Sequence, residues 1–135
     1  LFDTDAVSEL LKPRPNLRYA DWVRSLPWRE QFISAVSLGE LLRGAYMHSD
    51  SRFLNAIEQR VLSAVTVLPF DTPAARIFGW ISSDLRRAGT PLEDADLQIA
   101  ATAIRHGLEL VTGNIRHFSR VPGLVINPVL AVARR

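Results

Sequence analysis

The sequence contains no cysteine and only three histidines, and this shortage limits its chemistry. Without cysteine there is no disulfide framework, no thiol nucleophile and no cysteine-ligated zinc or iron–sulfur site. Three scattered histidines also make a poor set of zinc ligands. Any metal ion that this chain uses must therefore be bound by oxygen atoms.

Long apolar runs are also missing. Polar residues break them well before the ~18–20 residues that span a bilayer, and no signal peptide opens the chain. We therefore expect a cytoplasmic protein without a membrane-spanning segment. Lysine is nearly absent as well, since fifteen of the sixteen basic side chains are arginine, and the net charge is +2. This mildly basic balance permits a phosphate-bearing partner without requiring one.

The composition that remains is that of an ordinary globular domain. The 135 residues are 47% hydrophobic and 22% charged, which argues against intrinsic disorder. The length and the absence of a linker or repeat predict a single domain over residues 1–135.

Short apolar strands alternate with helix-length segments along the chain. We predict strands at 1–3, 32–36, 65–68, 108–111 and 124–126, and helices at about 5–11, 17–25, 37–47, 51–63, 73–88 and 95–106. The expected helix caps are Thr4 or Asp5, Asn16, Ser37, Thr72 and Asp94. Strands separated by helices pair in parallel, so the pattern predicts an α/β fold, a three-layer α/β/α sandwich with a central, mainly parallel sheet.

Four oxygen-bearing side chains are expected at the carboxyl edge of this sheet, where such folds bind ligands. Asp3 ends the first strand, and Glu40 lies one helical turn after the second. Asp96 lies in the first turn of a helix, and Asn114 follows the fourth strand by three residues. Three carboxylates and an amide oxygen are hard ligands that suit Mg²⁺ or Mn²⁺. The predicted chemistry is metal-assisted attack of water on a phosphodiester.

Each of these residues also has a structural interpretation. Ser37 and Glu40 fit a capping box, in which Glu40 bonds back to the Ser37 amide. Asp96 suits a helix N-terminus through the helix dipole, and Asn114 is a common turn residue. Asp3 is harder to explain in this way, because an acid directly after a buried strand does not occupy a surface position.

Five segments, spread in order over nearly the whole chain, carry a family resemblance. They are LFDTDAVSEL at 1–10 with KPRP at 12–15, SAVSLGEL at 34–41, PLEDADLQIAATA at 91–103, GLELVTGNIRHF at 107–118 and INP at 126–128. Any one of them alone is weakly specific, whereas the ordered set is strongly specific. Together they resemble the PIN-domain toxins of VapBC-type (type II) toxin–antitoxin pairs, in the branch that includes FitB-like proteins.

This resemblance implies an endoribonuclease that depends on Mg²⁺ or Mn²⁺. By match to the family motifs, Asp3, Glu40 and Asp96 are implied as the metal-binding catalytic acids. Asn114 stands where many members carry a fourth acid and is the implied fourth catalytic residue. Asp5 and Thr112 are implied as supporting residues that orient these ligands.

The resemblance also implies partners. They are a cognate antitoxin that wraps the toxin with an amphipathic segment and obstructs the acidic pocket, an RNA substrate, and a second copy of the chain in a homodimer. Trp22, Trp28 and Trp80 are candidates for such interfaces, although tryptophan is more often a core residue. No histidine is placed as an obvious base, and His106 and His117 are expected at helix ends.

Two other functions remain open. The LFDTDAV segment also fits a haloacid-dehalogenase-like phosphatase with Asp3 as nucleophile. Such enzymes need a later Lys or Arg beside the site and a further acidic motif, but the only lysine is Lys12 and no such motif follows. The second is a non-catalytic domain that binds RNA or a partner protein. Mn²⁺-dependent RNA cleavage that disappears in Asp3→Asn would discriminate between these functions.

Overall fold

The central element of the fold is a parallel sheet, seen in a computed structural model that describes all of residues 1–135. Its strands are β1 (Phe32–Ser34), β2 (Thr66–Leu68), β3 (Leu110–Val111) and β4 (Ile126–Asn127). β1 pairs in parallel with β2, and β3 with β4. Phe2 joins the two pairs through parallel bridges to Ile33 and Val111. The first residues therefore lie in the middle of the sheet, in the order β2, β1, Phe2, β3, β4.

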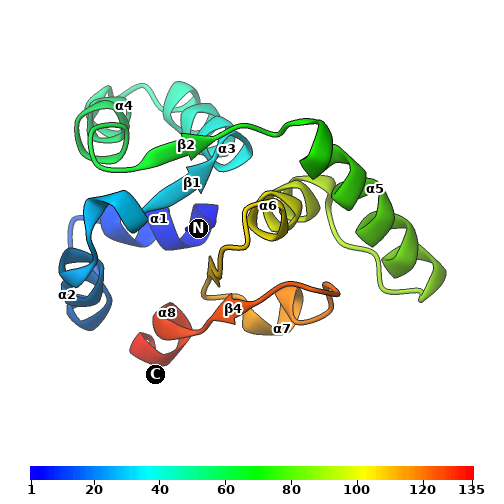
Figure 1. Cartoon of the computed structure of the whole chain (residues 1–135). Helices are drawn as coiled ribbons and strands as arrows, with labels where there is room; N and C mark the ends of the chain where they lie inside the picture. The colour runs from blue at the N-terminus through cyan, green and yellow to red at the C-terminus, as the bar shows by residue number, and fades with distance from the viewer.

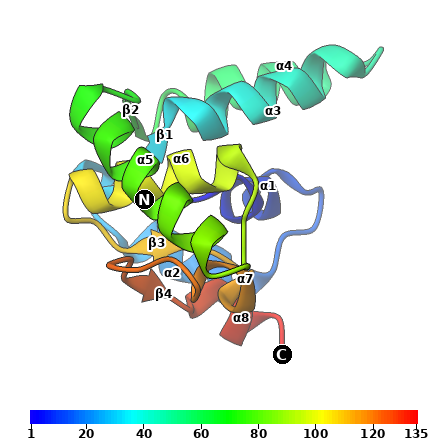
Figure 2. The ribbon, with the colours of Figure 1, turned by 90° about the vertical axis from the view of Figure 1, so that its right-hand side faces the viewer.

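Helices surround this sheet on both faces (Figure 1). They are α1 (Thr4–Leu11), α2 (Leu17–Ser25), α3 (Ala35–Met47), α4 (Arg52–Ala56), α5 (Thr72–Arg87), α6 (Asp94–Arg105), α7 (Ile115–Phe118) and α8 (Val129–Ala133), with a 3-10 turn η1 (Trp28–Glu30) and a π-helical turn η2 (Ile57–Val61) that continues α4. In the turned view of Figure 2, α5 and α6 lie in front of the sheet and α3 and α4 run above it. None of these helices combines the length and the apolar character that a membrane-spanning segment needs.

Two separate hydrophobic cores show that the fold has three layers. Consecutive residues of a strand point to opposite faces. Accordingly, Leu1 and Leu110 belong to a core with α5 and α6, whereas Phe2 and Val111 belong to a core with α1, α2 and α3. The prediction of an α/β/α sandwich with a parallel sheet is confirmed.

Several predicted helix starts are wrong by one to three residues. Asp3, rather than Thr4 or Asp5, caps α1, and its Oδ1 accepts a hydrogen bond from the Ala6 amide at 2.7 Å. β1 is shorter than predicted, so Ser34 caps α3 in place of Ser37. The cap residues that precede α5 and α6 are Asp71 and Glu93 rather than Thr72 and Asp94. Asp3 therefore directly follows a strand and is also the N-cap of α1.

Other local predictions are confirmed. The Asn16 side chain caps α2 by accepting from the Tyr19 amide at 3.1 Å. Gly89 and Gly107 adopt positive φ angles of 74° and 63° at the ends of their helices, a conformation that glycine takes without strain. On α2, Tyr19, Ala20 and Val23 are buried, whereas Leu17 is 71% exposed.

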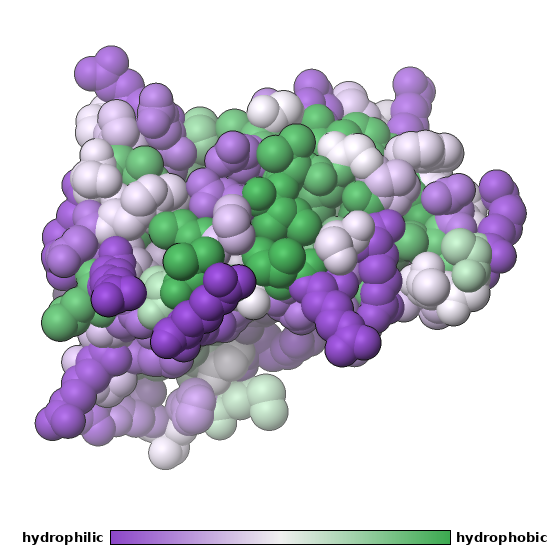
Figure 3. Space-filling view, turned by 90° about the horizontal axis from the view of Figure 1, so that it is seen from below, coloured by the Kyte–Doolittle hydropathy of each residue, from purple (hydrophilic) through white to green (hydrophobic).

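Apolar side chains also reach the surface. Figure 3 shows hydrophobic atoms gathered between hydrophilic ones on the side that carries α7, α8 and β4 in Figure 1. The large exposed hydrophobic residues of the chain include Val125 beside β4, Val132 in α8 and Trp80 in α5. These positions offer apolar surface for a partner.

Candidate active site

The carboxyl edge of the sheet holds an acidic pocket of about 280 Å³. Its lining residues are Asp3, Thr4, Asp5, Glu40, Asp96, Ile99, Asn114 and Phe118. They come from the start of α1, from α3, from α6 and from the segment after β3. The structure therefore brings the three predicted acids and Asn114 together, although 111 positions separate the first from the last in the sequence.

Asp3 is the most buried acid of this pocket, with 4% of the residue exposed. Burial raises the pKa of its carboxyl to about 6, and the nearby charges of Asp5 and Asp96 raise it further. Hydrogen bonds from the Thr112 hydroxyl and the Ala6 amide oppose this rise. The ionised Asp3 carboxylate is therefore costly in the protein alone, and a bound cation would relieve that cost.

Glu40 projects from α3 toward the start of α1. Its Oε1 accepts a hydrogen bond from the Thr4 hydroxyl at 2.6 Å. The capping-box interpretation of Glu40 is wrong, because the Ser37 amide donates to the Ser34 hydroxyl at 2.9 Å and lies inside the helix. The Glu40 carboxylate therefore lies at the pocket and does not cap its own helix.

Asp96 lies in the first turn of α6 and contacts a residue that the sequence interpretation left out. Its Oδ2 lies 2.7 Å from Nε2 of His117 in α7. The prediction places His117 only at a helix end, where α7 does hold it. Its position three residues after Asn114 was the available sequence signal, because one turn of helix from Asn114 keeps a side chain near the same edge of the sheet.

Asn114 immediately precedes α7 and makes no side-chain capping bond there. Its backbone amide donates to the buried Thr112 hydroxyl at 3.0 Å. Thr112 thus touches both Asn114 and, through its hydroxyl, Asp3. This threonine links the loop after β3 to the first acid.

Asp5 lines the pocket but is engaged by the C-terminal end of the chain. Arg134 donates to both of its carboxylate oxygens, at 2.7 and 3.0 Å, and also to Glu9 at 2.8 Å. Glu9 is buried, accepts from Lys12, and has a pKa lowered to about 2, chiefly by the hydrogen bond from Lys12. Gly113 lies against this pair, since a Cβ atom there would meet the Arg134 guanidinium and the Asp5 carboxylate. Sequence reasoning missed the role of Arg134.

The residue types that line the pocket suit a hard divalent cation. Carboxylates with one amide oxygen are the ligands typical of Mg²⁺ and Mn²⁺. As the side chains are arranged here, no group of three or more acidic or histidine residues surrounds one ion position. Asp3, Glu40 and Asp96 each have at least one oxygen engaged by a protein donor. Binding of a divalent cation in the pocket would therefore require the side chains of these acids to adjust around their hydrogen bonds.

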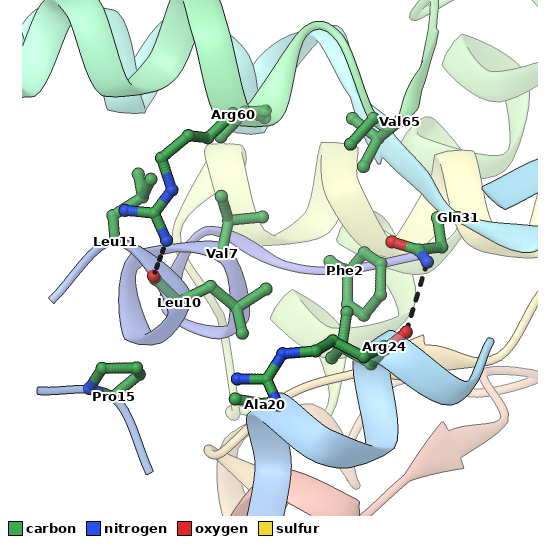
Figure 4. A pocket seen from close by; sticks show the side chains of 13 residues that line it. Phe2, Val7, Leu10, Leu11, Pro15, Ala20, Arg24, Gln31, Arg60 and Val65 are labelled. Atoms are coloured by element: carbon green, nitrogen blue, oxygen red, sulfur yellow. Dashed lines mark hydrogen bonds between the residues drawn. The ribbon is translucent and has the colours of Figure 1, made fainter. Parts of the chain in front are cut away.

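A second cavity, of about 270 Å³, is apolar and lies between α1, α2 and η2 (Figure 4). Val7, Leu10 and Ala20 line its wall. Arg60 reaches across it and donates to the backbone oxygen of Leu10 at 2.8 Å, and Arg24 stands on α2 at the same cavity. This cavity is chemically unlike the acidic pocket.

Comparison with known proteins decides the family. The sequence model of the PIN domain matches residues 1–124. The chain belongs to the PIN-domain family. This membership confirms the family resemblance and leaves no support for the phosphatase interpretation of the Asp3 segment.

Individual relatives cover nearly the whole PIN chain. It is 34% identical over 134 residues to Toxin FitB of Neisseria gonorrhoeae, with 95% of this chain and 96% of the relative covered. It is 33% identical, with the same coverage, to the VapC ribonuclease Y4jK of Sinorhizobium fredii. Its fold is similar to that of DNA-bound VapBC from Salmonella typhimurium, with a TM-score of 0.80, 33% identity, and 93% of this chain and 94% of that chain covered.

Proposed function

We propose that this PIN domain is a divalent-metal-dependent endoribonuclease and the toxin of a type II toxin–antitoxin pair. The observation that carries the proposal is the acidic pocket, in which Asp3, Glu40, Asp96 and Asn114 converge from four separate segments. The relatives named as a toxin and a ribonuclease, similar over nearly their full length, support the activity.

The catalytic roles follow from the chemistry of the pocket. Asp3, Glu40 and Asp96 are the residues that would hold Mg²⁺ or Mn²⁺, and Asn114 adds a neutral oxygen. When bound, such an ion supplies Lewis-acid polarisation of a phosphoryl oxygen and promotes hydrolysis by water. The hydrogen bonds from Thr4 and from the Ala6 amide hold two of the carboxylates in place before substrate arrives.

Divalent-ion-dependent cleavage of single-stranded RNA tests this function. We expect the protein to cut RNA with Mn²⁺ and to stop on addition of EDTA. Glu40→Gln, which keeps the acceptor for Thr4 but removes a charge, should lower the rate about 10²-fold or more. RNA binding without cleavage under any divalent ion would support the non-catalytic alternative, and hydrolysis of a phosphate monoester alone would support a phosphatase.

Substitutions of Asn114 should have smaller effects on activity than substitutions of the three acids. Because an amide oxygen can coordinate a hard cation but adds no charge, the pocket should balance one divalent ion better than two. Asn114→Ala should therefore reduce activity less than alanine at Asp3, Glu40 or Asp96. Asn114→Asp should tighten Mn²⁺ binding roughly tenfold at neutral pH, because ligand charge tunes affinity. Calorimetry showing no tightening would mean that residue 114 does not face the ion.

The partners of the proposed toxin fit features of its surface. An antitoxin segment with apolar side chains would suit the cavity between α1, α2 and η2, and acidic side chains on that segment would meet Arg24 and Arg60. The similarity to VapBC supports such a partner. A homodimer is also part of the proposal, for which the exposed Trp28 and Trp80 offer apolar surface.

A further inference from the structure

The three acids proposed to hold the ion, Asp3, Glu40 and Asp96, share a feature that the proposed function does not require. Each carboxylate accepts at least one short hydrogen bond from the protein, and Asp3 accepts a further one from the Thr112 hydroxyl. The donors are the Ala6 amide for Asp3, the Thr4 hydroxyl for Glu40 and the His117 ring for Asp96, at 2.7, 2.6 and 2.7 Å. Each acid thus has at least one oxygen held by the protein. The first two donors are built into α1, whereas the third is a side chain from a separate element.

His117 is itself held firmly. Its ring packs edge-on against Phe118, with centroids 5.2 Å apart and planes at 89°. Phe118 is buried and lines the acidic pocket. The His117 side chain is 25% exposed, so it lies partly within the wall rather than free in solvent. The imidazole that contacts Asp96 therefore packs against a buried aromatic side chain.

The direction of the hydrogen bond follows from its chemistry. A carboxylate has no proton to donate, so the Nε2–H of His117 donates to Oδ2 of Asp96. Hydrogen bonds to an ionised acceptor are shorter and stronger than neutral ones, which agrees with the 2.7 Å separation. The contact restrains rotation of the carboxylate and leaves Oδ1 for the pocket. It also ties α6 to α7, which immediately follows Asn114.

We propose that His117 is a positioning residue that orients the Asp96 carboxylate for the divalent ion. This inference rests on the proposed metal-dependent function. Outer hydrogen-bond partners of metal-binding side chains commonly contribute 10- to 100-fold in metal affinity or activity, because they restrict the ligand to its binding orientation. His117 would act through Asp96, without touching substrate.

The test compares three single variants with the parent protein, with Mn²⁺ alone as the calorimetric probe. His117→Ala removes the donor, and His117→Gln retains an N–H group near the position of Nε2. His106→Ala is the matched control, because His106 is exposed at the end of α6, away from Asp96 in the sequence and without a contact to it. Circular dichroism establishes that each variant is folded.

We expect His117→Ala to weaken Mn²⁺ binding about tenfold or more, His117→Gln to recover most of that loss and His106→Ala to change nothing. RNA cleavage by His117→Ala should recover as Mn²⁺ is raised. In the double variant His117→Ala/Asp96→Ala, the histidine change should add no further loss, since the two act through one contact.

Unchanged or tighter Mn²⁺ binding by His117→Ala would overturn the inference. Tighter binding would show that His117 competes with the ion for Asp96. These outcomes are distinct from failure of the proposed function, in which the parent protein itself would neither bind Mn²⁺ nor cleave RNA.

Discussion

Replacing Asp3 with Asn is expected to abolish RNA cleavage and, at the same time, to stabilise the metal-free protein. The loss of activity follows from removing the charge of the most buried acid in the pocket. The gain in stability follows from its pKa, which burial raises from 3.8 to about 6. An acid that is harder to ionise in the folded state lowers the free energy of unfolding once the pH exceeds its unfolded value.

The pH dependence has a definite sign. Well below pH 4, Asp3 is protonated in both the folded and the unfolded states, so its burial does not lower the free energy of unfolding. As the pH rises from about 4 to about 6, the unfolded chain ionises first and the folded state loses stability by about 3 kcal/mol in total. Asparagine resembles the protonated acid and remains a good helix cap for the Ala6 amide.

Chemical denaturation at pH 7.5 and at pH 4, with and without Mn²⁺, measures these effects. The Asp3→Asn variant should be the more stable protein at pH 7.5 without metal, and the difference should shrink toward pH 4. Mn²⁺ should stabilise the parent but not the variant. Asp84→Asn, at an exposed position of α5, is the control and should behave as the parent in every respect. A variant less stable than the parent at pH 7.5 would contradict the assignment of Asp3 as a strained, buried charge.

The position of the acids at one edge of the sheet was predictable from short sequence patterns. An acid directly after the apolar pair Leu1 and Phe2 indicated the end of a buried strand, and the strand does lie in the middle of the sheet. Helix-length spacing between apolar runs indicated parallel pairing, which places the acids at one edge. The predicted helix ends at about 88 and 106 likewise lie within one residue of the observed ends, next to the positive-φ residues Gly89 and Gly107.

The wrong predictions concern the residues at which helices start. The N-cap residue of a helix depends on where the preceding strand ends, and hydrophobic periodicity does not locate that end. Ser34 and Asp3 serve as caps because β1 ends two residues earlier than predicted, at Ser34, and the first strand ends one residue earlier, at Phe2. Because of this error, the two roles of the Asp3 carboxylate were not predicted from the sequence. It caps α1 and it also lines the acidic pocket.

The contacts missed entirely join residues that are far apart in the chain. His117 and Asp96 are separated by 21 positions, and Arg134 is 129 positions from Asp5 and 125 from Glu9. Periodicity and spacing report on neighbours along a helix or strand, so they contain no information about which charges meet after folding. The short helix α8, which Arg134 directly follows, was not predicted for the same reason, since its stability depends on burial of Leu130 in the α1 and α2 core and on the distant partners of Arg134.

Arg134 is expected to contribute much more to stability than its neighbour Arg135. Its guanidinium makes three hydrogen bonds to Asp5 and Glu9, and 5% of the Glu9 side chain is exposed. Truncating one partner leaves a buried carboxylate short of a donor, which costs several kcal/mol when both groups are buried. Because about a third of the Arg134 side chain is exposed, we expect Arg134→Ala to cost about 2 kcal/mol.

Arg135→Ala is the matched control for Arg134→Ala, because it removes the same charge from an adjacent exposed position and should stay within about 0.5 kcal/mol of the parent. Urea denaturation at pH 7.5 and at pH 3 compares the two. The pKa of Glu9 is lowered to about 2, so its contribution is present above about pH 4.5 and is lost as the pH falls toward 2. The deficit of Arg134→Ala should therefore be smaller at pH 3 than at pH 7.5. Equal stabilities of the two variants at pH 7.5 would mean that burial of Leu130, rather than the ion pairs, holds α8 against the first two helices.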